Sequence, residues 1–481
     1  MRYIYTLLIV HSFILSQSFG WQDGGVPIRQ GAHIEWGRTG DVGDDGNIIL
    51  GWSDTRSGDR DVYAQKIDSN GNELWGDGGL LVVSYEGRQE DPIMITDGAG
   101  GFYVIWSDFR NPPTSEGQPY AQHVSSDGSL TWDAGGMPLS DEKLEEFTLN
   151  MCKDGNGGAY VTWKKKSSSH FGSYLNQSNS GPTTELEVIS SNWSHSNPSL
   201  ETAGAGGAMM VWSDERNGNQ DIYGQRLEYN GTDLVMMWET IEDGDVDGED
   251  DFPIGGIPIS IASGAQSSQK VTYYSEEYSV VVWQDERNDD GDLYPDIYAT
   301  FIDVNGEPST FYGSDALPVV SDHNLDGTFD GEGQSKQTKP RVKANSNGAF
   351  VIWNDFRNDD TGDIYVQKIT HENNGVWQGT STLPFDGIPV SEEENEQLNS
   401  RLTVDGNDGV FIVWENESNQ QRDIKIKHID SSGNSTYADN GMIICDSDKD
   451  QISPLVVRDG NGGTFTVWED QRDGSKGLYV Q

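Results

Sequence analysis

Short runs of apolar and aromatic residues that end in tryptophan recur along the whole chain. The spacing between successive tryptophans ranges from 49 residues (Trp163 to Trp212) to 71 residues (Trp212 to Trp283). This period suits a four-stranded unit with loops of variable length and is too long for most helical repeats. The eight runs are Ile48–Trp52, Phe102–Trp106, Ala159–Trp163, Ala208–Trp212, Ser279–Trp283, Ala349–Trp353, Val410–Trp414 and Thr464–Trp468.

The segments around each run follow one order. A strand that often contains Pro, as in Gln451–Val457, leads into a Gly-rich turn, as in Asp459–Gly463, and then into the Trp run. Next come Trp-x-Asp-x-Arg (Trp212–Arg216), Asp-Ile-Tyr-x-Gln (Asp221–Gln225) and Gly-Gly-x-Pro-x-Ser (Gly255–Ser260). Asp-Gly and Asn-Gly turns between runs of period two indicate antiparallel hairpins, and no dozen residues show a strong helical period. We therefore expect an all-β protein with little helix.

The two ends of the chain predict a closed ring. Trp21–Ile28 matches the fourth strand of the repeat, whereas Gly477–Gln481 matches its third strand. Pairing these segments would complete one blade and leave few exposed sheet edges. The prediction is a single eight-bladed β-propeller of four-stranded antiparallel blades over residues 21–481. The alternative is a fragment of a longer adhesin-like repeat protein.

The Asp–Arg and Asp-Ile-Tyr pattern, as in Ser213–Arg216 and Asp221–Tyr223, resembles the TolB-type propeller repeat over nearly all of residues 21–481. With Trp before the Asp and Gln after the Tyr, it is also similar to repeat proteins exported by marine Bacteroidetes-like bacteria. The resemblance implies a propeller that binds a protein or another ligand. It transfers no catalytic residues.

Charge and the N-terminus narrow the choice of partners. The formal net charge is −48, from 79 acidic and 31 basic residues, so we expect no nucleic-acid partner. Residues 1–20 match a signal peptide: Arg2 precedes the apolar stretch Ile4–Leu15, and Ser18–Gly20 provides a cleavage site. That stretch is too short to span a membrane. We expect a secreted or outer-surface protein without membrane insertion.

Residues that recur in most repeats are interpreted as scaffold, because a functional site is normally built once. The repeated Asp is expected to accept backbone N–H bonds, the repeated Arg to pair with a carboxylate, and the repeated Gln to make hydrogen bonds between blades. Cys152 and Cys445 are expected to be separate buried thiols. The Gln residues are Gln65, Gln122, Gln225 and Gln367.

Two acidic loops depart from the repeat and are candidate Ca²⁺ sites. Both contain alternating oxygen-bearing side chains followed by Gly, as in Ca²⁺-binding loops, although neither is a complete EF-hand. The alternative is that both are solvated acidic inserts. They project from opposite faces of a propeller, so they cannot form one joint site. The candidate ligands are Asp243, Asp245, Asp247 and Asp251 in one loop, and Asp322, Asn324, Asp326, Asp330 and Glu332 in the other.

The leading hypothesis is a non-enzymatic extracellular propeller that binds a protein or glycan and is stabilised by Ca²⁺. The alternative function is a carbohydrate-active hydrolase or lyase with its site at the central channel. No nucleophile elbow, phosphate loop or His-Glu-x-x-His sequence is present, and the histidines show no metal-ligand spacing. Lys164–Lys166 replaces the Asp–Arg turn in the third repeat. It is interpreted as a relaxed, solvated loop, with docking of an anionic partner as the alternative.

Calcium binding predicts that EDTA lowers the thermal midpoint of unfolding, because a metal bound only by the native state stabilises it. The double variant Asp245→Ala, Asp326→Ala should melt at one temperature with and without Ca²⁺. Equal midpoints for the unchanged protein in Ca²⁺ and in EDTA would refute the prediction that bound Ca²⁺ stabilises the fold.

Overall fold

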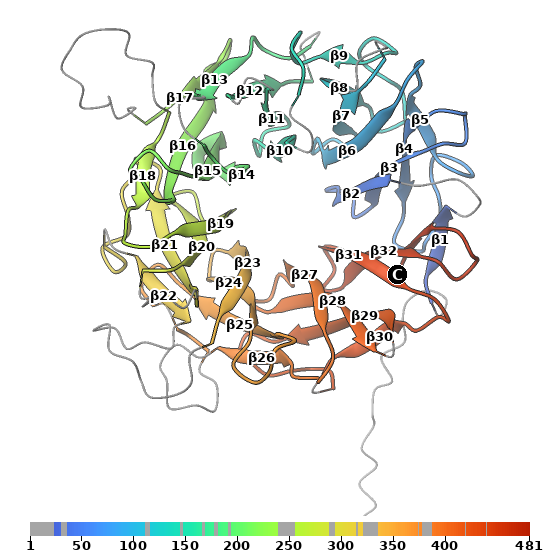
Figure 1. Cartoon of the computed structure of the whole chain (residues 1–481). Coiled ribbons are helices and arrows are strands. Elements are labelled where there is room, and N and C mark those ends of the chain that lie inside the picture. Colours follow the sequence, from blue (N-terminus) through green and yellow to red (C-terminus); the bar gives the residue numbers. More distant parts are fainter. Residues whose placement is uncertain are drawn as a thin grey trace, which may run out of the picture.

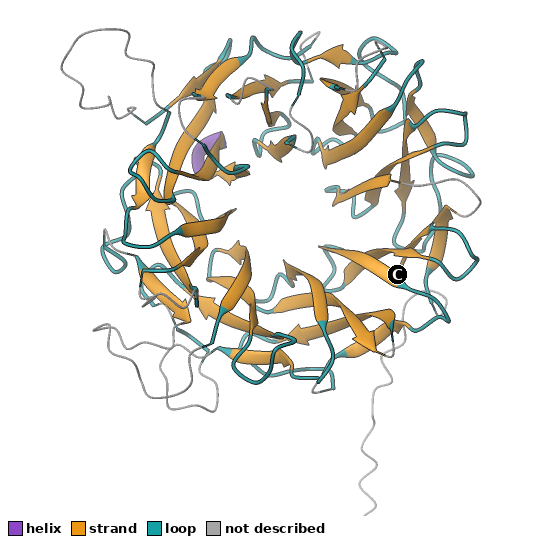
Figure 2. Ribbon diagram, in the orientation of Figure 1, coloured by secondary structure: helices purple, strands orange, loops and turns teal. Residues whose placement is uncertain are grey.

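Each Trp run lies in the second strand of its own antiparallel sheet, and eight such sheets form a ring around a central channel (Figure 1). The structure is a computed structural model. It describes residues 24–29, 36–110, 116–144, 148–165, 169–177, 181–190, 194–238, 255–287, 294–313, 316–320, 335–373, 375–377, 387–418, 420–438 and 440–481. Among these, strands predominate and the helical element is the 3₁₀ turn η1 (Gly204–Gly206), as Figure 2 shows. The predicted all-β propeller of eight blades is confirmed.

The blades are numbered here in the order of their tryptophans, and the strands of a blade are called a to d from the channel outward. Blade 1 contains β2 (Trp36–Val42), β3 (Ile48–Asp54), β4 (Asp61–Ile67) and β5 (Leu80–Val83). Blade 2 contains β6 (Gln89–Thr96), β7 (Phe102–Asp108), β8 (Gln118–Val124) and β9 (Met137–Pro138). Blade 3 contains β10 (Asn150–Lys153), β11 (Ala159–Lys164), β12 (His170–Leu175) and β13 (Leu186–Ile189). Blade 4 contains β14 (Ser199–Ala203), β15 (Gly207–Asp214), β16 (Asp221–Tyr229) and β18 (Ile257–Ser260), and the short β17 (Leu234–Met236) pairs with the far end of β16.

The second half of the ring repeats this arrangement. Blade 5 contains β19 (Gln266–Tyr273), β20 (Tyr278–Asp285), β21 (Asp296–Asp303) and β22 (Leu317–Val320). Blade 6 contains β23 (Gln337–Asn345), β24 (Gly348–Asp355), β25 (Asp363–Ile369) and β26 (Ile388–Ser391). Blade 7 contains β27 (Gln397–Val404), β28 (Val410–Ser418), β29 (Gln421–Ile429) and β30 (Met442–Cys445). Blade 8 contains β31 (Gln451–Arg458), β32 (Thr464–Asp470), β33 (Gly477–Val480) and β1 (Val26–Arg29).

The ring closes between the first and last strands, as the sequence predicts. Strand β1 pairs antiparallel with β33, with Val26 opposite Val480 and Pro27 opposite Tyr479. The guanidinium of Arg472 also donates from Nη2 to the carbonyl oxygen of Gly24 at 2.9 Å. Blade 8 therefore joins strands from both ends of the described chain.

The hydrophobic core is divided into eight clusters, and each cluster joins two consecutive blades. Strand b contributes to two clusters at once: Ile48, Leu50 and Trp52 face blade 8, whereas Ile49 faces blade 2. Because both faces of strand b are covered, its sequence is almost continuously apolar rather than alternating. The eight tryptophans are at most 1% exposed.

The Gly-Gly pair before strand d is required by the tryptophan of the same blade. Gly79 has a φ of 82°, and a Cβ placed on it would lie 2.9 Å from the Trp52 ring. Gly25 at the ring closure has a φ of 81°, and its Cβ would lie 2.4 Å from the Trp468 ring. Only glycine combines this left-handed backbone with so close an approach.

Substituting Trp52 tests the closure of the ring. Trp52→Ala should lower the free energy of unfolding by about 3–5 kcal/mol, because it leaves a cavity between blades 8 and 1. Urea denaturation followed by circular dichroism measures this change. Leu81→Ala is the matched control, since Leu81 is 45% exposed and should change the midpoint little. Equal effects of the two substitutions would contradict a packed closure.

Candidate functional site

Each complete Trp-x-Asp-x-Arg segment forms a compact hydrogen-bonded unit at the end of strand b. In blade 4, Trp212 Nε1 donates to Asp214 Oδ2 at 2.9 Å, and Arg216 Nη2 donates to the same oxygen at 2.6 Å. The guanidinium carbon of Arg216 lies 3.7 Å from the centroid of the Tyr223 ring. One buried carboxylate therefore links strand b, the b–c connection and strand c.

This unit recurs in blades 1, 2, 4, 5, 6 and 8, which confirms that the repeated Asp and Arg residues belong to the scaffold. Burial by itself raises the pKa of Asp54, but the hydrogen bonds from Arg56 and Trp52 outweigh it and leave this pKa below its usual value. The same balance lowers the pKa of Asp470. The Asp–Arg pairs are Asp54–Arg56, Asp108–Arg110, Asp214–Arg216, Asp285–Arg287, Asp355–Arg357 and Asp470–Arg472.

The prediction that the repeated Gln residues bond directly between blades is wrong. Gln225 donates from Nε2 to the carbonyl of Trp238 at 3.2 Å and accepts from the Trp238 N–H at 3.0 Å, all within blade 4. The c–d connection folds back beside strand c, so its backbone is the nearest partner. The link to the next blade is one step removed, since Trp238 Nε1 donates to Val304 O at 3.0 Å. Gln65, Gln122 and Gln367 likewise accept the backbone N–H of Trp75, Trp132 and Trp377.

Blade 3 lacks the unit, and Lys165 stands at the position of the Asp. Lys165 Nζ forms ion pairs with Glu185 at 2.6 Å and Glu142 at 3.2 Å, and it lies 3.7 Å from the Phe171 ring centroid. The residue is 2% exposed, so the expectation of a solvated loop is wrong for Lys165. Trp163 Nε1 is buried without a hydrogen-bond partner among the described residues.

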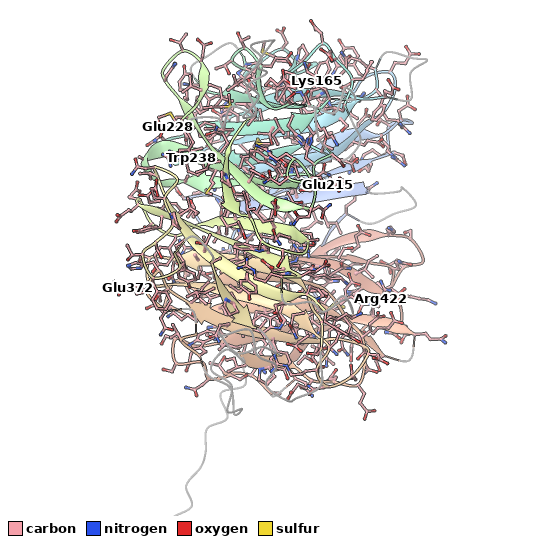
Figure 3. All side chains as sticks on the ribbon, turned by 60° about the vertical axis from the view of Figure 1, so that its left-hand side comes forward. Lys165, Glu215, Glu228, Trp238, Glu372 and Arg422 are labelled. Atoms are coloured by element: carbon pink, nitrogen blue, oxygen red, sulfur yellow. The ribbon has the colours of Figure 1, made fainter. Side chains whose placement is uncertain are left out.

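Blade 7 also departs from the repeat, with Asn416 in place of the Asp and Lys425 in place of the Tyr. The buried Glu415 pairs with Arg422, and Lys425 pairs with Glu393. Figure 3 labels Lys165 and Arg422, the residues that mark the two irregular blades. In both blades these cations form ion pairs within the molecule, so we interpret them as part of the scaffold rather than as a binding site.

All nine predicted Ca²⁺ ligands lie outside the described residues: Asp243, Asp245, Asp247, Asp251, Asp322, Asn324, Asp326, Asp330 and Glu332. Within the described part of the chain, no three His, Cys, Asp or Glu side chains are grouped so as to hold a metal ion. Cys152 and Cys445 are free and buried, as predicted. Calcium binding therefore stays a prediction from the sequence.

Two arrangements of Asp, His and Thr are present that the sequence analysis missed. His123 lies 2.9 Å from Asp97 through Nε2 and 2.8 Å from Thr131 through Nδ1. An equivalent set in blade 7 consists of Asp405, His428 and Thr436. His123 is 5% exposed, and in both sets the Asp also holds backbone N–H groups of the a–b turn. Recurrence and burial make these sets structural, and aligning the a–b turns with strand c would have revealed them.

The innermost strands surround the channel, and each contacts its two neighbours around the full ring. Strand register divides their side chains into levels. We call upper ring the eight strand-a residues, one per blade, that lie opposite the residue just before the Trp of strand b. We call lower ring the eight strand-a residues that lie opposite the residue three positions before that Trp. The upper ring is Thr39, Ile93, Asn150, Ser199, Lys270, Arg341, Arg401 and Leu455; the lower ring is Asp41, Ile95, Cys152, Glu201, Thr272, Lys343, Thr403 and Val457.

The upper ring contains three cations on consecutive blades, Lys270, Arg341 and Arg401, which we call the cationic arc. All three side chains are half-buried on innermost strands. Burial lowers the pKa of the Lys270 ammonium, and the charges of Arg341 and Arg401 lower it further. Within the described residues, neither Lys270 nor Arg341 pairs with a carboxylate, and the Lys270 ammonium donates to its neighbour's carbonyl, Gln269 O, at 3.0 Å. The three like charges therefore lie close enough to repel one another.

The lower ring has the opposite character, because its charges are paired across blades. Lys343 Nζ of blade 6 lies 2.7 Å from Glu201 Oε2 of blade 4. Next to this ring, Lys153 Nζ of blade 3 lies 2.6 Å from Asp41 Oδ2 of blade 1. Each salt bridge passes over the blade between its partners, so these side chains reach into the channel. The upper ring lies nearer the b–c connections, since strand a begins where strand b ends.

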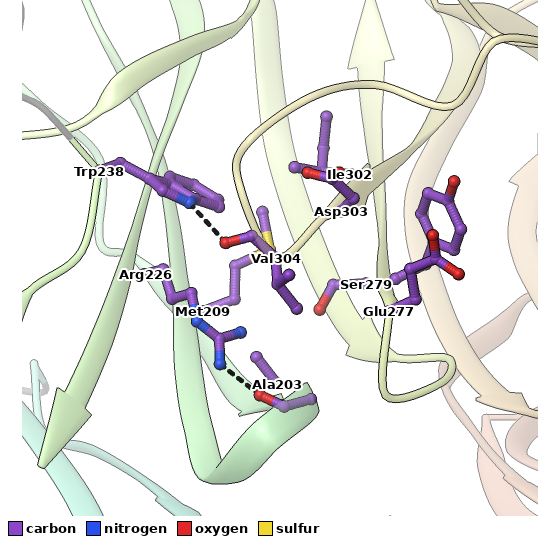
Figure 4. A pocket seen from close by; sticks show the side chains of 11 residues that line it. Ala203, Met209, Arg226, Trp238, Glu277, Ser279, Ile302, Asp303 and Val304 are labelled. Atoms are coloured by element: carbon purple, nitrogen blue, oxygen red, sulfur yellow. Dashed lines mark hydrogen bonds between the residues drawn. The ribbon is translucent and has the colours of Figure 1, made fainter.

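The cavity between blades 4 and 5 (Figure 4) is too small for a ligand. Its volume is about 10 Å³, room for about one water molecule. The hydrogen bond from Trp238 to Val304 joins blade 4 to blade 5 there, and the bond from Arg226 to Gly204 holds the a–b turn of blade 4 against its strand c. The cavity therefore belongs to the packing between blades.

Comparison with known proteins identifies no family. No family model matches the chain, and no curated protein matches its sequence. Among solved structures, a PL25 ulvan lyase is 10% identical over 96% of this chain and 94% of its own, with a TM-score of 0.43. The BP39L lectin from Burkholderia pseudomallei is 10% identical over 83% of this chain and 96% of its own, also with a TM-score of 0.43. A protein of unknown function from Dyadobacter fermentans is 12% identical over 72% and 96%, with a TM-score of 0.37.

These similarities do not bear on ligand or activity. The chain forms an eight-bladed β-propeller, and the resemblances to TolB-type repeats and to exported repeat proteins of marine Bacteroidetes-like bacteria stay predictions. No helix among the described residues is long and apolar enough to cross a membrane.

Asp363, the first residue of the Asp-Ile-Tyr segment in blade 6, makes the stability of the fold depend on pH. Burial raises the pKa of Asp363 to about 6, helped by the charges of Asp359, Glu392 and Asp355 and opposed by a hydrogen bond from Asn358. Between the usual pKa of 3.8 and about 6, the folded protein holds a proton that the unfolded chain has released. Stability from this group is therefore present at low pH and is lost as pH rises through that window.

Asp363→Asn should accordingly raise the urea midpoint at about pH 8 and leave it unchanged at about pH 4. Asp54→Asn is the matched control, because the pKa of Asp54 is lowered. Its ionised form stabilises the fold, so this substitution should lower the midpoint at about pH 8 and matter less in acid. Shifts of equal sign for the two variants at about pH 8 would contradict the assignment.

Proposed function

We propose that the protein is an exported binding propeller that holds the anionic part of a glycan in its central channel. The observation that carries this proposal is the cationic arc. In a chain with a formal net charge of −48, most described cations are paired with carboxylates, whereas Lys270 and Arg341 have no carboxylate partner among the described residues. Half-buried cations without counter-charges attract an anionic ligand strongly, because water screens them only partly.

Binding is favoured over catalysis by the state of the channel carboxylates. Asp41 Oδ2 accepts from the Thr96 N–H and hydroxyl and also pairs with Lys153. Glu201 is held by Lys343. Carboxylates engaged in this way are poorly placed to exchange protons with a substrate. A hydrolase or lyase acting in the channel stays the second candidate, because Asp41 and Glu201 lie one level below the arc.

Two further parts of the proposal rest on the sequence. Export rests on the signal-peptide pattern of residues 1–20, and Ca²⁺ stabilisation rests on the acidic loops. A nucleic-acid ligand is disfavoured, because the outer surface of so acidic a chain repels it.

Glycan binding can be tested by titration calorimetry with neutral, uronate-containing and sulfated oligosaccharides. Acidic glycans should bind and neutral ones should not, and added salt should weaken binding. Arg341→Met and Arg401→Met should each lower affinity roughly tenfold, since a hydrogen bond to a charged group contributes about 1.5–3 kcal/mol.

Lys476→Met is the control, because Lys476 lies in the b–c connection of blade 8, pairs with Glu469 and is remote from the arc. Its affinity should equal that of the unchanged protein. Salt-independent binding of neutral glycans, or unchanged affinity in both Arg variants, would refute the proposal. Appearance of new reducing ends or unsaturated uronates during incubation would favour the enzyme instead.

A further inference from the structure

The three cations of the arc share one level of the channel rather than following its axis. Lys270 pairs in register with Val282, Arg341 with Ile352, and Arg401 with Val413, each directly before the Trp of strand b. A ligand threaded along the channel would need cations at several levels. Cations gathered at one level on three adjacent strands suit a single compact anionic group.

The arc is bounded on both sides. On blade 4, the Ser199 hydroxyl is occupied by the N–H of Val271, at 3.2 Å. On blade 8, Leu455 packs against the apolar cluster that joins blades 8 and 1. The neighbouring positions therefore add no charge, and the anionic group is confined to the width of blades 5 to 7.

The arc is also bounded below. Lys343 lies two residues beyond Arg341 on the same strand, about 7 Å further along, but its charge is satisfied by Glu201. Asp41 is paired with Lys153 in the same way, so this level offers no uncompensated cation that would draw an anion deeper into the channel. The ligand therefore meets the arc from the face of the b–c connections and ends there.

We infer that the cationic arc binds one terminal tetrahedral oxyanion, a sulfate or phosphate monoester, at the end of a ligand that enters from the b–c face. This inference rests on the proposed function and specifies its ligand. An ester-linked sulfate or phosphate presents three free oxygens, one for each cation, whereas a carboxylate presents two. The planar fork of Arg341 matches two oxyanion oxygens, Arg401 adds a positive charge while its Nη1 donates to Ser400 O at 2.9 Å, and Lys270 supplies a point charge.

The first experiment compares small anions on the intact protein. Sulfate, phosphate and acetate are titrated against thermal unfolding at constant ionic strength. Sulfate and phosphate should raise the midpoint at concentrations at least tenfold below that of acetate. Arg341→Met and Arg401→Met should each weaken the sulfate effect tenfold or more, and Arg341→Lys should weaken it less. Arg458→Met is the matched control on an innermost strand, because the exposed Arg458 lies at the opposite end of strand a.

The second experiment separates the two esters and the direction of entry. Affinity for a sugar phosphate should rise between about pH 5 and pH 7, where its second proton is lost at a pKa near 6, while affinity for a sugar sulfate should stay constant. The ester that binds more tightly, phosphate or sulfate, identifies the group that the natural ligand carries. An oligosaccharide with the ester at its end should bind at least tenfold more tightly than one with the ester only at an internal position.

The outcomes separate a failure of this inference from a failure of the proposed function. Equal effects of acetate and sulfate, or equal affinity for terminal and internal esters, would overturn this inference, while loss of acidic-glycan binding in Arg341→Met would still support the proposed function. Binding of sulfate, phosphate and acidic glycans unchanged in both Arg→Met variants would overturn both. Each variant must first show the unfolding cooperativity of the unchanged protein, which separates loss of binding from loss of fold.

Discussion

The structure depends on one packing interaction, the insertion of each strand-b tryptophan between its own blade and the preceding one. A four-stranded sheet with two apolar faces cannot shield both by itself. Each blade therefore needs a neighbour on either side, and a closed ring supplies them. The cluster that joins Phe465 and Val467 to Ile48, Leu50 and Trp52 is the same kind of contact as the other seven. The interface between blades 8 and 1 is thus an ordinary blade interface, and the β1–β33 pairing inside blade 8 is what joins distant parts of the chain.

The Asp–Arg pair allows the tryptophan to be buried, because it gives the indole N–H a hydrogen-bond acceptor. The Asp accepts a hydrogen bond from the indole N–H, the Arg neutralises the Asp, and the Tyr of strand c covers the Arg. The two blades that lose the Asp support this dependence, since the indole nitrogens of Trp163 and Trp414 are buried with no hydrogen-bond partner among the described residues. Six arginines are consumed in this scaffold. Lys270 and Arg341 in the channel lie outside this scaffold and have no carboxylate partner among the described residues.

The distribution of charge links the scaffold to the proposed function. Negative charge prevails over the chain as a whole, whereas three cations gather on the inner strands of blades 5 to 7. Salt bridges one level below hold the nearest carboxylates at fixed positions. Attraction to an anion is then confined to one level of the channel. A ring of near-identical blades acquires a site where a few of its repeated positions differ.

The sequence alone determined the repeat, the eight-bladed ring, its closure and the scaffold role of Asp and Arg, because these follow from local alternation, turns and recurrence. It did not determine the partners of the Gln residues, since Gln225 bonds to a backbone that approaches only after the c–d connection folds back. Nor did it reveal the cationic arc. Lys270, Arg341 and Arg401 occupy three separate repeats, and each by itself is an unremarkable strand residue. Only the packing of blades 5, 6 and 7 against one another places their strands side by side, and so only the tertiary structure turns three scattered charges into one site.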